Sequence, residues 1–360
     1  MPKLLIDFLP EELSELFVGM GLQKYRARQV YEWVMKGVDE FSGMKNLPKD
    51  LREKLADTPE ITIGIPKIKK KLVSEIDGTR KYIMEFYDGN IIESVLMVYN
   101  HGITACISSQ VGCRMGCAFC ASEDAGFVRN LSGGEMLGQV IAMQNDAGER
   151  ISGVVVMGVG EPLDNYEEFL RFIKLVNCPE GLNIGQRHIT VSTCGIIPKI
   201  EALSDENLQI TLAISLHSSD NSKRKEIMPV NRKYNIEDVL TACRNYIAKT
   251  KRRITFEYAL IKGFNDSEAD AAALAGLLKG LMCHVNLIPV NTVKGKDFRR
   301  SGIEIARAFE SVLKRKGIET TVRRELGMDI NAACGQLRKE QLGEQLTIKG
   351  RIVKVLKFIV

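Results

Sequence analysis

The sequence has no long apolar run and no recognisable export signal. No window approaches the ~18 consecutive apolar residues that a membrane-spanning helix needs. Met1-Pro2-Lys3-Leu4 leads directly into charged sequence rather than into the apolar segment of a signal peptide. We therefore expect a cytoplasmic protein with no membrane association. Aromatic residues are scarce at 6%, but 45% of the 360 residues are hydrophobic, which excludes collagen and wholesale disorder.

An excess of charge of one sign is also missing. The chain has 50 basic and 45 acidic residues, and a net charge of +5 does not by itself indicate a nucleic-acid-binding protein. The basic residues are concentrated in two stretches: four lysines lie within 67–71, and ten basic against four acidic residues lie within 294–324. Such stretches are either solvated helix faces or surfaces that contact an RNA backbone, and the charge pattern alone leaves both open.

Cysteine, by contrast, is not scarce. The chain contains nine cysteines, and we expect a reducing cytoplasm around them. In that compartment cysteines are more often metal ligands or catalytic groups than partners in structural disulfides.

Residues 1–98 are predicted to form a small accessory domain of helices and a hairpin. Leu9-Pro10-Glu11-Glu12 marks a helix start, because proline and acidic residues favour the first helical turn. Asp88-Gly89-Asn90 separates two strand-like segments, 80–87 and 91–99, and predicts a β-hairpin. A second helix is predicted from apolar residues that share one face at helical spacing: Tyr25, Val30, Tyr31, Val34 and Met35.

From residue 99 to 336 the pattern alternates between short strands and amphipathic helices. The predicted strands are 104–107, 153–157, 188–192, 209–214, 253–260, 284–290 and one near 320–323, and the predicted helices include 132–145, 166–176, 235–248 and 266–281. Repeated βα units indicate an α/β fold with a parallel sheet. Six to seven units in ~230 residues are too few for a closed eight-stranded barrel, so we predict an open partial (β/α)₆ barrel. Functional groups should then lie at the carboxyl ends of the strands.

The most specific motif is a CxxxCxxC segment formed by Cys113, Cys117 and Cys120. Three closely spaced thiolates suit an iron–sulfur cube, which normally takes four cysteines, and three ligands leave one iron open to a substrate or cofactor. A structural zinc site would need a fourth ligand, which Cys106 could supply, but CxxxC is an uncommon zinc spacing. Inert buried cysteines are the remaining alternative, and they are the default interpretation of Cys178, Cys243 and Cys283.

A CxxxCxxC after the first strand of a partial (β/α)₆ barrel resembles the radical S-adenosylmethionine (SAM) superfamily. The resemblance implies one 4Fe-4S cluster held by Cys113, Cys117 and Cys120, whose open iron chelates SAM. It also implies that an electron from the cluster cleaves SAM to a deoxyadenosyl radical. The segment 158–162 (GVGEP), with Gly160 and Glu161, is similar to the superfamily segment that holds the methionine ammonium group. Further cofactor-binding candidates at predicted strand ends are Ser192, Ser215, Leu216, His217 and Asn291.

Other segments narrow the resemblance to the RlmN family. These are 106–113 (CISSQVGC), 327–337 (GMDINAACGQL), 183–192 (NIGQRHITVS), 228–231 (MPVN) and 24–30 (KYRARQV). The resemblance implies methylation of carbon 2 of an adenosine in 23S rRNA and in some tRNAs. It further implies two SAM molecules per turnover, an electron donor such as flavodoxin or ferredoxin, and a monomeric enzyme. Because a stacked adenine cannot reach such a pocket, the target base must be unpaired or flipped out.

On this interpretation, the chemistry of the reaction explains why two further cysteines, Cys334 and Cys106, are needed. Carbon 2 of adenine and the methyl group of SAM are both electrophilic, so direct polar transfer is unfavourable, whereas a thiolate is a good nucleophile toward SAM. The resemblance implies that Cys334 accepts a methyl group, which becomes the carbon radical that adds to adenine. It assigns Cys106 to resolving the protein–RNA adduct through a transient Cys106–Cys334 disulfide, and Glu93 to accepting a proton. Without the resemblance, Glu93 would be interpreted as an exposed carboxylate on a hairpin.

Two other functions compete with this one. The related Cfr enzymes use the same five cysteines to methylate carbon 8 of the same ribosomal adenosine, and the quoted motifs do not distinguish them. A cluster- or zinc-bearing RNA-binding module without catalysis is the second alternative. Cys194 stands near the expected SAM pocket, and the apolar, basic carboxy-terminal extension 337–360 has no predicted role.

Overall fold

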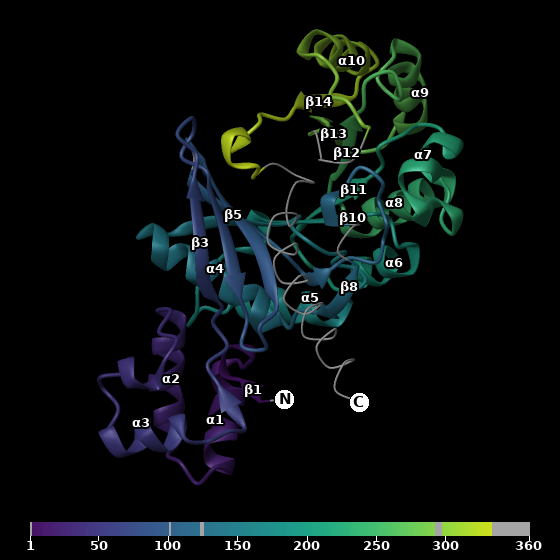
Figure 1. The fold of residues 1–360 in the computed structure, drawn as a ribbon. Helices are drawn as coiled ribbons and strands as arrows, with labels where there is room; N and C mark the ends of the chain where they lie inside the picture. The colour runs from purple at the N-terminus through teal and green to yellow at the C-terminus, as the bar shows by residue number, and fades with distance from the viewer. Residues whose placement is uncertain (1, 101, 123–125, 292–296, 333–360) are drawn as a thin grey trace, which may run out of the picture.

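The computed structural model describes residues 2–100, 102–122, 126–291 and 297–332. The accessory helices lie at one end of the molecule, and the barrel with its surrounding helices makes up the rest (Figure 1). Cys334 and the extension 337–360 lie outside the described residues. Within those residues, no helix combines the length and the apolar character needed to cross a membrane.

The amino-terminal unit is helical, as predicted. Its elements are β1 (Lys3–Leu4), η1 (Leu5–Asp7), α1 (Pro10–Gly19), α2 (Lys24–Met35), η2 (Phe41–Gly43), α3 (Lys49–Ala56) and β2 (Ile61–Thr62). Pro10 opens α1, and the Leu9 amide donates to Glu12 Oε2 at 2.8 Å, which caps the first turn. The predicted face of α2 needs one correction: Tyr25 is 56% exposed. Ala27 is buried on that face instead. The Arg26 guanidinium lies 4.7 Å from the Tyr25 ring centroid.

One ten-stranded sheet runs through the rest of the molecule. Its strands are β3 (Lys67–Val73), β4 (Arg80–Glu85), β5 (Ile91–Tyr99), β6 (Gly102–Ile107), β9 (Ile151–Val156), β10 (Ile189–Thr193), β11 (Thr211–Ser215), β12 (Ile254–Leu260), β13 (Cys283–Pro289) and β14 (Glu319–Val322). Their spatial order is β14-β13-β12-β11-β10-β9-β6-β5-β4-β3. From β6 to β14 all neighbours pair in parallel, whereas β3, β4, β5 and β6 pair antiparallel.

Helices alternate with the parallel strands, which confirms the predicted partial (β/α) barrel. They are α4 (Gly133–Ala147), α5 (Tyr166–Asn177), α6 (Ile197–Asp205), α7 (Asn221–Ile227), α8 (Ile236–Thr250), α9 (Glu268–Leu278) and α10 (Ile303–Arg315). Short 3₁₀ turns follow at η4 (Gln186–His188), η5 (Pro229–Arg232) and η6 (Met328–Ile330). Helix α10 was not predicted; it occupies part of the basic stretch 294–324. Apolar residues of the strands and of the facing helices form one continuous core.

The predicted hairpin is present, but it belongs to the large sheet. Strands β4 and β5 pair antiparallel around Asp88-Gly89-Asn90, and β5 continues by pairing with β6, the first barrel strand. The sheet therefore passes through residue 98 without interruption (Figure 1). That residues 1–98 form a separate domain stays a prediction.

A buried polar contact fastens the amino-terminal unit to the barrel. The Gly134 amide, in the first turn of α4, donates to Asp7 Oδ1 at 2.6 Å. A Cβ at residue 134 would lie 2.4 Å from that oxygen, so only glycine allows this approach. Burial raises the pKa of Asp7 to about 6. The Arg171 Nε–H also donates to the Asp7 carbonyl at 3.0 Å, so the two parts are joined in a defined orientation.

Candidate functional site

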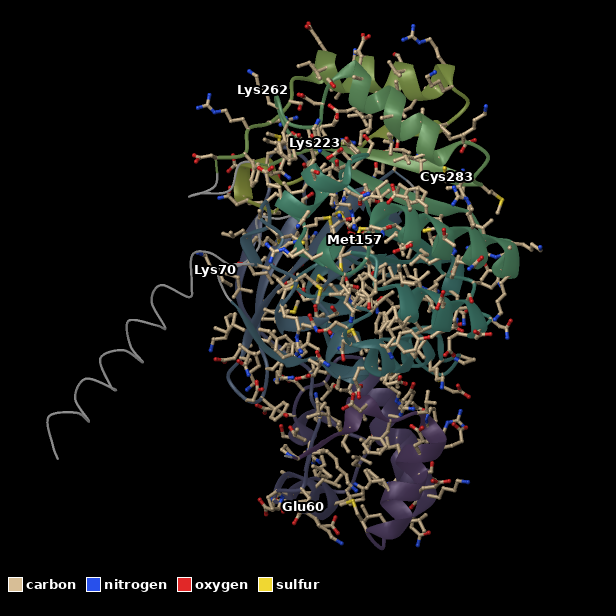
Figure 2. All side chains as sticks on the ribbon, turned by 90° about the vertical axis from the view of Figure 1, so that its right-hand side faces the viewer. Glu60, Lys70, Met157, Lys223, Lys262 and Cys283 are labelled. Carbon is tan, nitrogen blue, oxygen red and sulfur yellow. The ribbon has the colours of Figure 1, made fainter. Side chains whose placement is uncertain are left out.

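The three motif cysteines line one cavity at the carboxyl ends of the parallel strands. They lie on the loop between β7 (Gln110–Gly112) and β8 (Phe127–Asn130), a small antiparallel pair that follows β6. The cavity has a volume of about 190 Å³, and Met157, labelled in Figure 2, lines it at the end of β9. Cys113, Cys117 and Cys120 all contribute to its wall. The sequence-based expectation that this motif faces a pocket at the strand ends agrees with the structure.

The cysteine loop is held by contacts with the barrel. The Ala118 amide donates to the Ile227 carbonyl at 2.9 Å, at the end of α7. The Phe119 ring packs edge-on against His217, with 4.9 Å between ring centroids. The loop position is therefore determined by residues that follow it by about a hundred positions in the chain, as tertiary packing requires.

The thiols fit a cluster better than a single zinc ion. In the described part of the chain, no group of three or more His, Cys, Asp and Glu residues could hold one metal ion together. A zinc site needs such convergence, whereas each cysteine of an iron–sulfur cube binds a different iron. Burial raises the pKa of Cys113 to about 12 and that of Cys117 well above its usual value. Both therefore carry protons until iron replaces them.

The glycine-rich turn after β9 is shaped by close packing. Gly160 has φ +111°, and a Cβ there would lie 2.7 Å from Gln110 Cβ and 2.8 Å from the Gln110 amide nitrogen. Only glycine fits both the backbone angle and the space. Glu161 lines the cavity, but its carboxylate also accepts the amides of Cys194 at 2.7 Å and Leu163 at 3.0 Å. The Glu161 side chain thus joins the ends of β9 and β10, which the motif alone did not indicate.

Most of the other strand-end candidates meet in the same cavity. Ser192, Ser215, His217 and Asn291 all line it, and the Ser192 and Ser215 hydroxyls lie 3.2 Å apart. Leu216 differs: its side chain is fully buried in the hydrophobic core. Its predicted contact with the cofactor remains a prediction.

His217 is held as a neutral donor. Its φ is +56°, and Nδ1 accepts the Ala259 amide at 2.9 Å, which places the remaining proton on Nε2. Burial of the ring lowers the pKa of His217 to about 3, and the nearby Arg224 cation contributes a smaller part of this decrease. The imidazole is therefore neutral throughout the physiological pH range.

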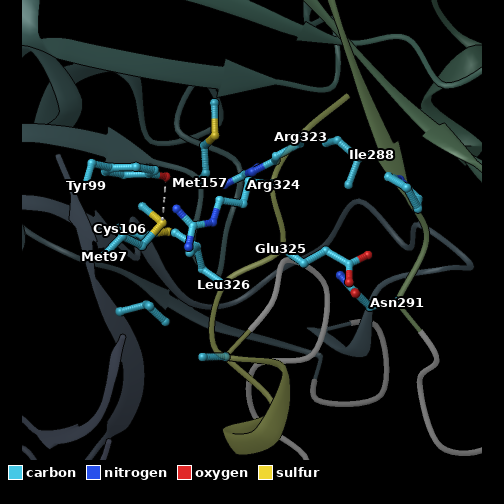
Figure 3. Close-up of a pocket in the computed structure, with 13 residues that line it drawn as sticks. Met97, Tyr99, Cys106, Met157, Ile288, Asn291, Arg323, Arg324, Glu325 and Leu326 are labelled. Carbon is cyan, nitrogen blue, oxygen red and sulfur yellow. Dashed lines mark hydrogen bonds between the residues drawn. The ribbon is translucent and has the colours of Figure 1, made fainter. Parts of the chain in front are cut away.

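A second, smaller cavity contains Cys106 (Figure 3). Cys106 lies on β6 and is 5% exposed, and Leu326 and Ala332 pack beside it. Ala332 is two residues before Cys334, so the described chain approaches Cys106 immediately before the segment that carries the predicted methyl acceptor. Met157, Ile288, Asn291 and Arg323 line both cavities, which are therefore adjacent.

Glu93 is buried, unlike a typical carboxylate on a hairpin. It lies on β5 with 6% exposure, because β5 is an interior strand between β4 and β6. The Lys81 ammonium on β4 lies 2.9 Å from Glu93 Oε2, and both side chains are less than a tenth exposed. Lys81 Nζ also donates to the Asn331 carbonyl at 3.2 Å. One buried lysine thus links the predicted proton acceptor to the segment that leads to Cys334.

We expect Lys81→Met to destabilise the protein by about 3–5 kcal/mol, because it removes the cation that pairs with the buried Glu93 carboxylate. Urea unfolding measures this free energy directly. The double variant Lys81→Met/Glu93→Leu should recover most of the loss, since it removes both charges. A loss below about 1 kcal/mol in the single variant, the range of exposed ion pairs, would contradict the buried pairing.

Sequence reasoning missed several cavity residues. Glu257 on β12 is 4% exposed, accepts Asn286 Nδ2 at 2.9 Å, and has a pKa raised by burial. It lies in the middle of the predicted strand 253–260, so the expectation that functional groups lie at strand ends did not indicate it. Cys194 lines the cavity beside Glu161, as expected, and burial raises the pKa of its thiol. Met228 also lines the cavity.

Two known families match separate parts of the chain. Residues 107–275 match the family described as the "Radical SAM superfamily". Residues 4–61 match the family described as "Ribosomal RNA large subunit methyltransferase N-terminal domain". The first match covers the cysteine loop and most of the barrel, and the second covers the helical amino-terminal unit.

Individual proteins resemble nearly the whole chain. A protein of Clostridium botulinum strain Eklund 17B, named "Probable dual-specificity RNA methyltransferase RlmN", is 55% identical over 96% of this chain and 99% of its own length. One of the same name from Alkaliphilus oremlandii is 55% identical over 94% of this chain and 98% of its own length. The crystal structure of a radical SAM methyltransferase from Sphaerobacter thermophilus superimposes with a TM-score of 0.89, at 44% identity, over 94% of this chain and 99% of that chain.

Proposed function

This chain belongs to the RlmN family of radical SAM methyltransferases, and from that premise we propose that it methylates carbon 2 of a specific adenosine in 23S rRNA and in some tRNAs. One observation carries the proposal most directly. The cavity of the three motif cysteines adjoins the cavity of Cys106, and both share Met157, Ile288, Asn291 and Arg323. Cluster chemistry and thiol chemistry can therefore take place on one bound base.

The residues of the chain have separable tasks in this reaction. Bound cluster and SAM supply the methyl group and the one-electron chemistry. Cys334, which lies outside the described residues, would accept the methyl group as a sulfur nucleophile. Glu93 would take up the proton that leaves carbon 2, and the odd electron of the adduct would return to the bound cluster. Lys81 holds the Glu93 carboxylate in place.

Cys106 completes the cycle in the proposal. Its thiolate attacks the sulfur of Cys334, the bond from that sulfur to the transferred carbon breaks, and a Cys106–Cys334 disulfide forms. The transferred carbon takes a proton and becomes the methyl group. An external thiol reductant then returns both cysteines to the reduced state. The packing of Cys106 beside Ala332 supports this pairing, because it brings β6 to the chain just before residue 334.

RNA contact is proposed for the accessory helices and the basic stretch 294–324. Tyr25 is 56% exposed with Arg26 beside its ring, an aromatic–cation pair of the kind that stacks on unpaired bases. Arg28 is also exposed on α2, with 78% of its side chain accessible. The surface therefore offers both stacking and phosphate neutralisation on one helix.

We expect RNA affinity to fall steeply with salt, because each neutralised phosphate releases bound counterions. With roughly six phosphate contacts, affinity should fall about 10³-fold between about 50 mM and about 200 mM salt. Fluorescence anisotropy with a labelled ribosomal RNA hairpin measures this slope. Arg26→Ala should reduce the slope by about one unit, whereas an affinity independent of salt would refute phosphate contact.

The decisive experiment is anaerobic incubation of the reconstituted enzyme with SAM, a reductant and ribosomal RNA or tRNA, followed by nucleoside mass spectrometry. Recovery of 2-methyladenosine, with two SAM molecules consumed per methyl group, supports the proposal. Recovery of 8-methyladenosine would indicate a Cfr-type enzyme instead. An intact cluster without any methylated adenosine would indicate an RNA-binding module.

The same preparations test the remaining proposals about partners. We propose flavodoxin or ferredoxin as the electron donor, and either should replace the chemical reductant in this assay. We also propose that the enzyme acts as a monomer, which sedimentation of the holoenzyme measures.

A further inference from the structure

Arg224 is a fully buried cation that the reaction scheme does not use. Arg224 lies on α7 and is 0% exposed. Its neighbour Lys225 is exposed, and the ammonium group of its other neighbour, Lys223, lies 2.6 Å from an Asp270 carboxylate oxygen. Lys223, labelled in Figure 2, and Lys225 are partly or fully exposed, whereas the Arg224 guanidinium hydrogen-bonds to barrel residues. A buried guanidinium of this kind requires a reason, since removing the charge from water is unfavourable by several kcal/mol.

All five N–H groups of Arg224 are already used. Nε donates to the Leu216 carbonyl at 3.0 Å. Nη1 donates to Asn231 Oδ1 at 2.8 Å and to the Tyr234 carbonyl at 3.3 Å. Nη2 donates to the carbonyls of Cys194 at 2.8 Å and Ser215 at 3.3 Å. A guanidinium has five such donors, so none is left to bind a ligand directly.

These five acceptors are all neutral. Four are backbone carbonyls and one is an amide oxygen, so no carboxylate is among the hydrogen-bond partners that the described residues provide. Carbonyl dipoles solvate the charge in part but do not neutralise it. Burial lowers the pKa of Arg224, yet a guanidinium stays protonated in proteins. The side chain therefore acts on its surroundings as a fixed positive charge in a medium of low dielectric constant.

That charge lies behind the cysteine loop. Helix α7 ends at Ile227, whose carbonyl accepts the Ala118 amide between two of the motif cysteines. Cys117 packs with Ile227, Met228 and Cys194 in one apolar cluster, and Arg224 is bonded to the Cys194 carbonyl. These contacts place the Arg224 charge behind the loop whose thiolates would hold a negatively charged cluster.

We propose that Arg224 is the fixed counter-cation of the iron–sulfur cluster and favours its one-electron reduction. This inference rests on the cluster of the proposed function. A cube held by three thiolates gains one electron from an external low-potential donor, takes up no proton, and becomes more negative by one charge. A nearby buried cation stabilises the reduced form more than the oxidised form. Arg224 thus acts through the cluster, and it contacts neither SAM nor RNA.

The test is a redox titration of the reconstituted enzyme with dithionite. The electron paramagnetic resonance signal of the reduced cluster measures the extent of reduction at each potential. Arg224→Gln should shift the midpoint potential to more negative values, by 59 mV for each tenfold change in the one-electron equilibrium constant. Asn231→Asp is a second variant: it keeps the guanidinium and an oxygen acceptor for Nη1, and it places a negative charge on that acceptor. It also loses the Nδ2 hydrogen bonds to Asn221, so iron content is compared first. It should shift the potential in the same direction.

Two controls separate the charge from the hydrogen bonds. Arg224→Lys retains the charge and loses the forked contacts, so its potential should stay nearer to the wild-type value than that of Arg224→Gln. Arg252→Gln removes a different guanidinium, whose Nε donates to the Ile210 carbonyl at 2.8 Å, just before β11. This control should leave the midpoint potential unchanged. Iron and sulfide content, measured on every variant, shows whether a cluster has formed.

The outcomes distinguish this inference from the proposed function. Absence of a cluster in the wild-type protein would overturn the proposed function and this inference with it. A wild-type potential in Asn231→Asp with full iron content would overturn the inference alone. So would equal shifts in Arg224→Lys and Arg224→Gln, which would assign Arg224 a purely structural role.

Discussion

Cys106→Ala should convert the enzyme into one that remains covalently attached to its RNA. In the proposed cycle the Cys106 thiolate is the group that cleaves the bond from Cys334 to the transferred carbon. Cys106 is 5% exposed in a cavity lined by Met97, Leu326 and Ala332, so bulk thiols have poor access to replace it. Repeated turnover should stop, with about one RNA retained per protein, because nucleophilic release is the step that frees the enzyme.

Denaturing gel electrophoresis after anaerobic reaction measures the retained RNA, and mass spectrometry of nuclease-treated protein locates the modified residue. Cys178→Ala is the matched control, since Cys178 is similarly buried at 7% exposure but lies at the end of α5, away from both cavities. It should turn over normally without an adduct. Wild-type turnover in Cys106→Ala would contradict the assigned role.

Cys117→Ser should abolish both the cluster and RNA methylation. The replacement keeps the size of the side chain but removes one of three thiolates that an iron–sulfur cube needs from this loop. Activity should fall to the uncatalysed background, roughly 10⁶-fold or more, because all radical chemistry depends on that cluster. Brown colour, iron and sulfide should be lost in parallel.

Cys283→Ser provides the control for sulfur loss itself. Cys283 is buried at 8% exposure at the start of β13, the end of the strand opposite the cavity. Its variant should retain wild-type iron content and activity. A Cys117→Ser protein that still assembles a complete cluster with methylation activity would show that the three-cysteine assignment is wrong.

Local patterns were sufficient for much of the fold. Strand-like segments on both sides of Asp88-Gly89-Asn90 predicted the hairpin, and each predicted barrel strand is present within a few residues of its expected bounds. These patterns succeed because a strand or hairpin is specified by neighbours in the chain. Tyr25 shows the limit: its helical spacing matches the buried face of α2, but no element among the described residues covers that first turn, so the ring is exposed.

Burial of charged groups could not be predicted in the same way. Lys223-Arg224-Lys225 has the composition of a solvated basic segment, yet docking of α7 against the barrel buries the middle residue completely. Glu93 has the pattern of an exposed hairpin residue, but pairing of β5 with β6 places it inside the sheet next to Lys81. In both cases the partners are carbonyls or side chains from other elements, which one-dimensional spacing does not reveal.

The sequence by itself determined which reactive groups are available: three cysteines in a CxxxCxxC motif, a glycine-rich turn after a barrel strand, and the two further cysteines to which we assign thiol chemistry. Only the tertiary structure decided which of these groups share a space. Packing of parallel strands brings their carboxyl ends to one edge, and the adjacent cavities around Cys117 and Cys106 form there. The fixed charge of Arg224 behind the cysteine loop is likewise a product of packing, because only the folded barrel removes that charge from water and supplies five neutral acceptors for it.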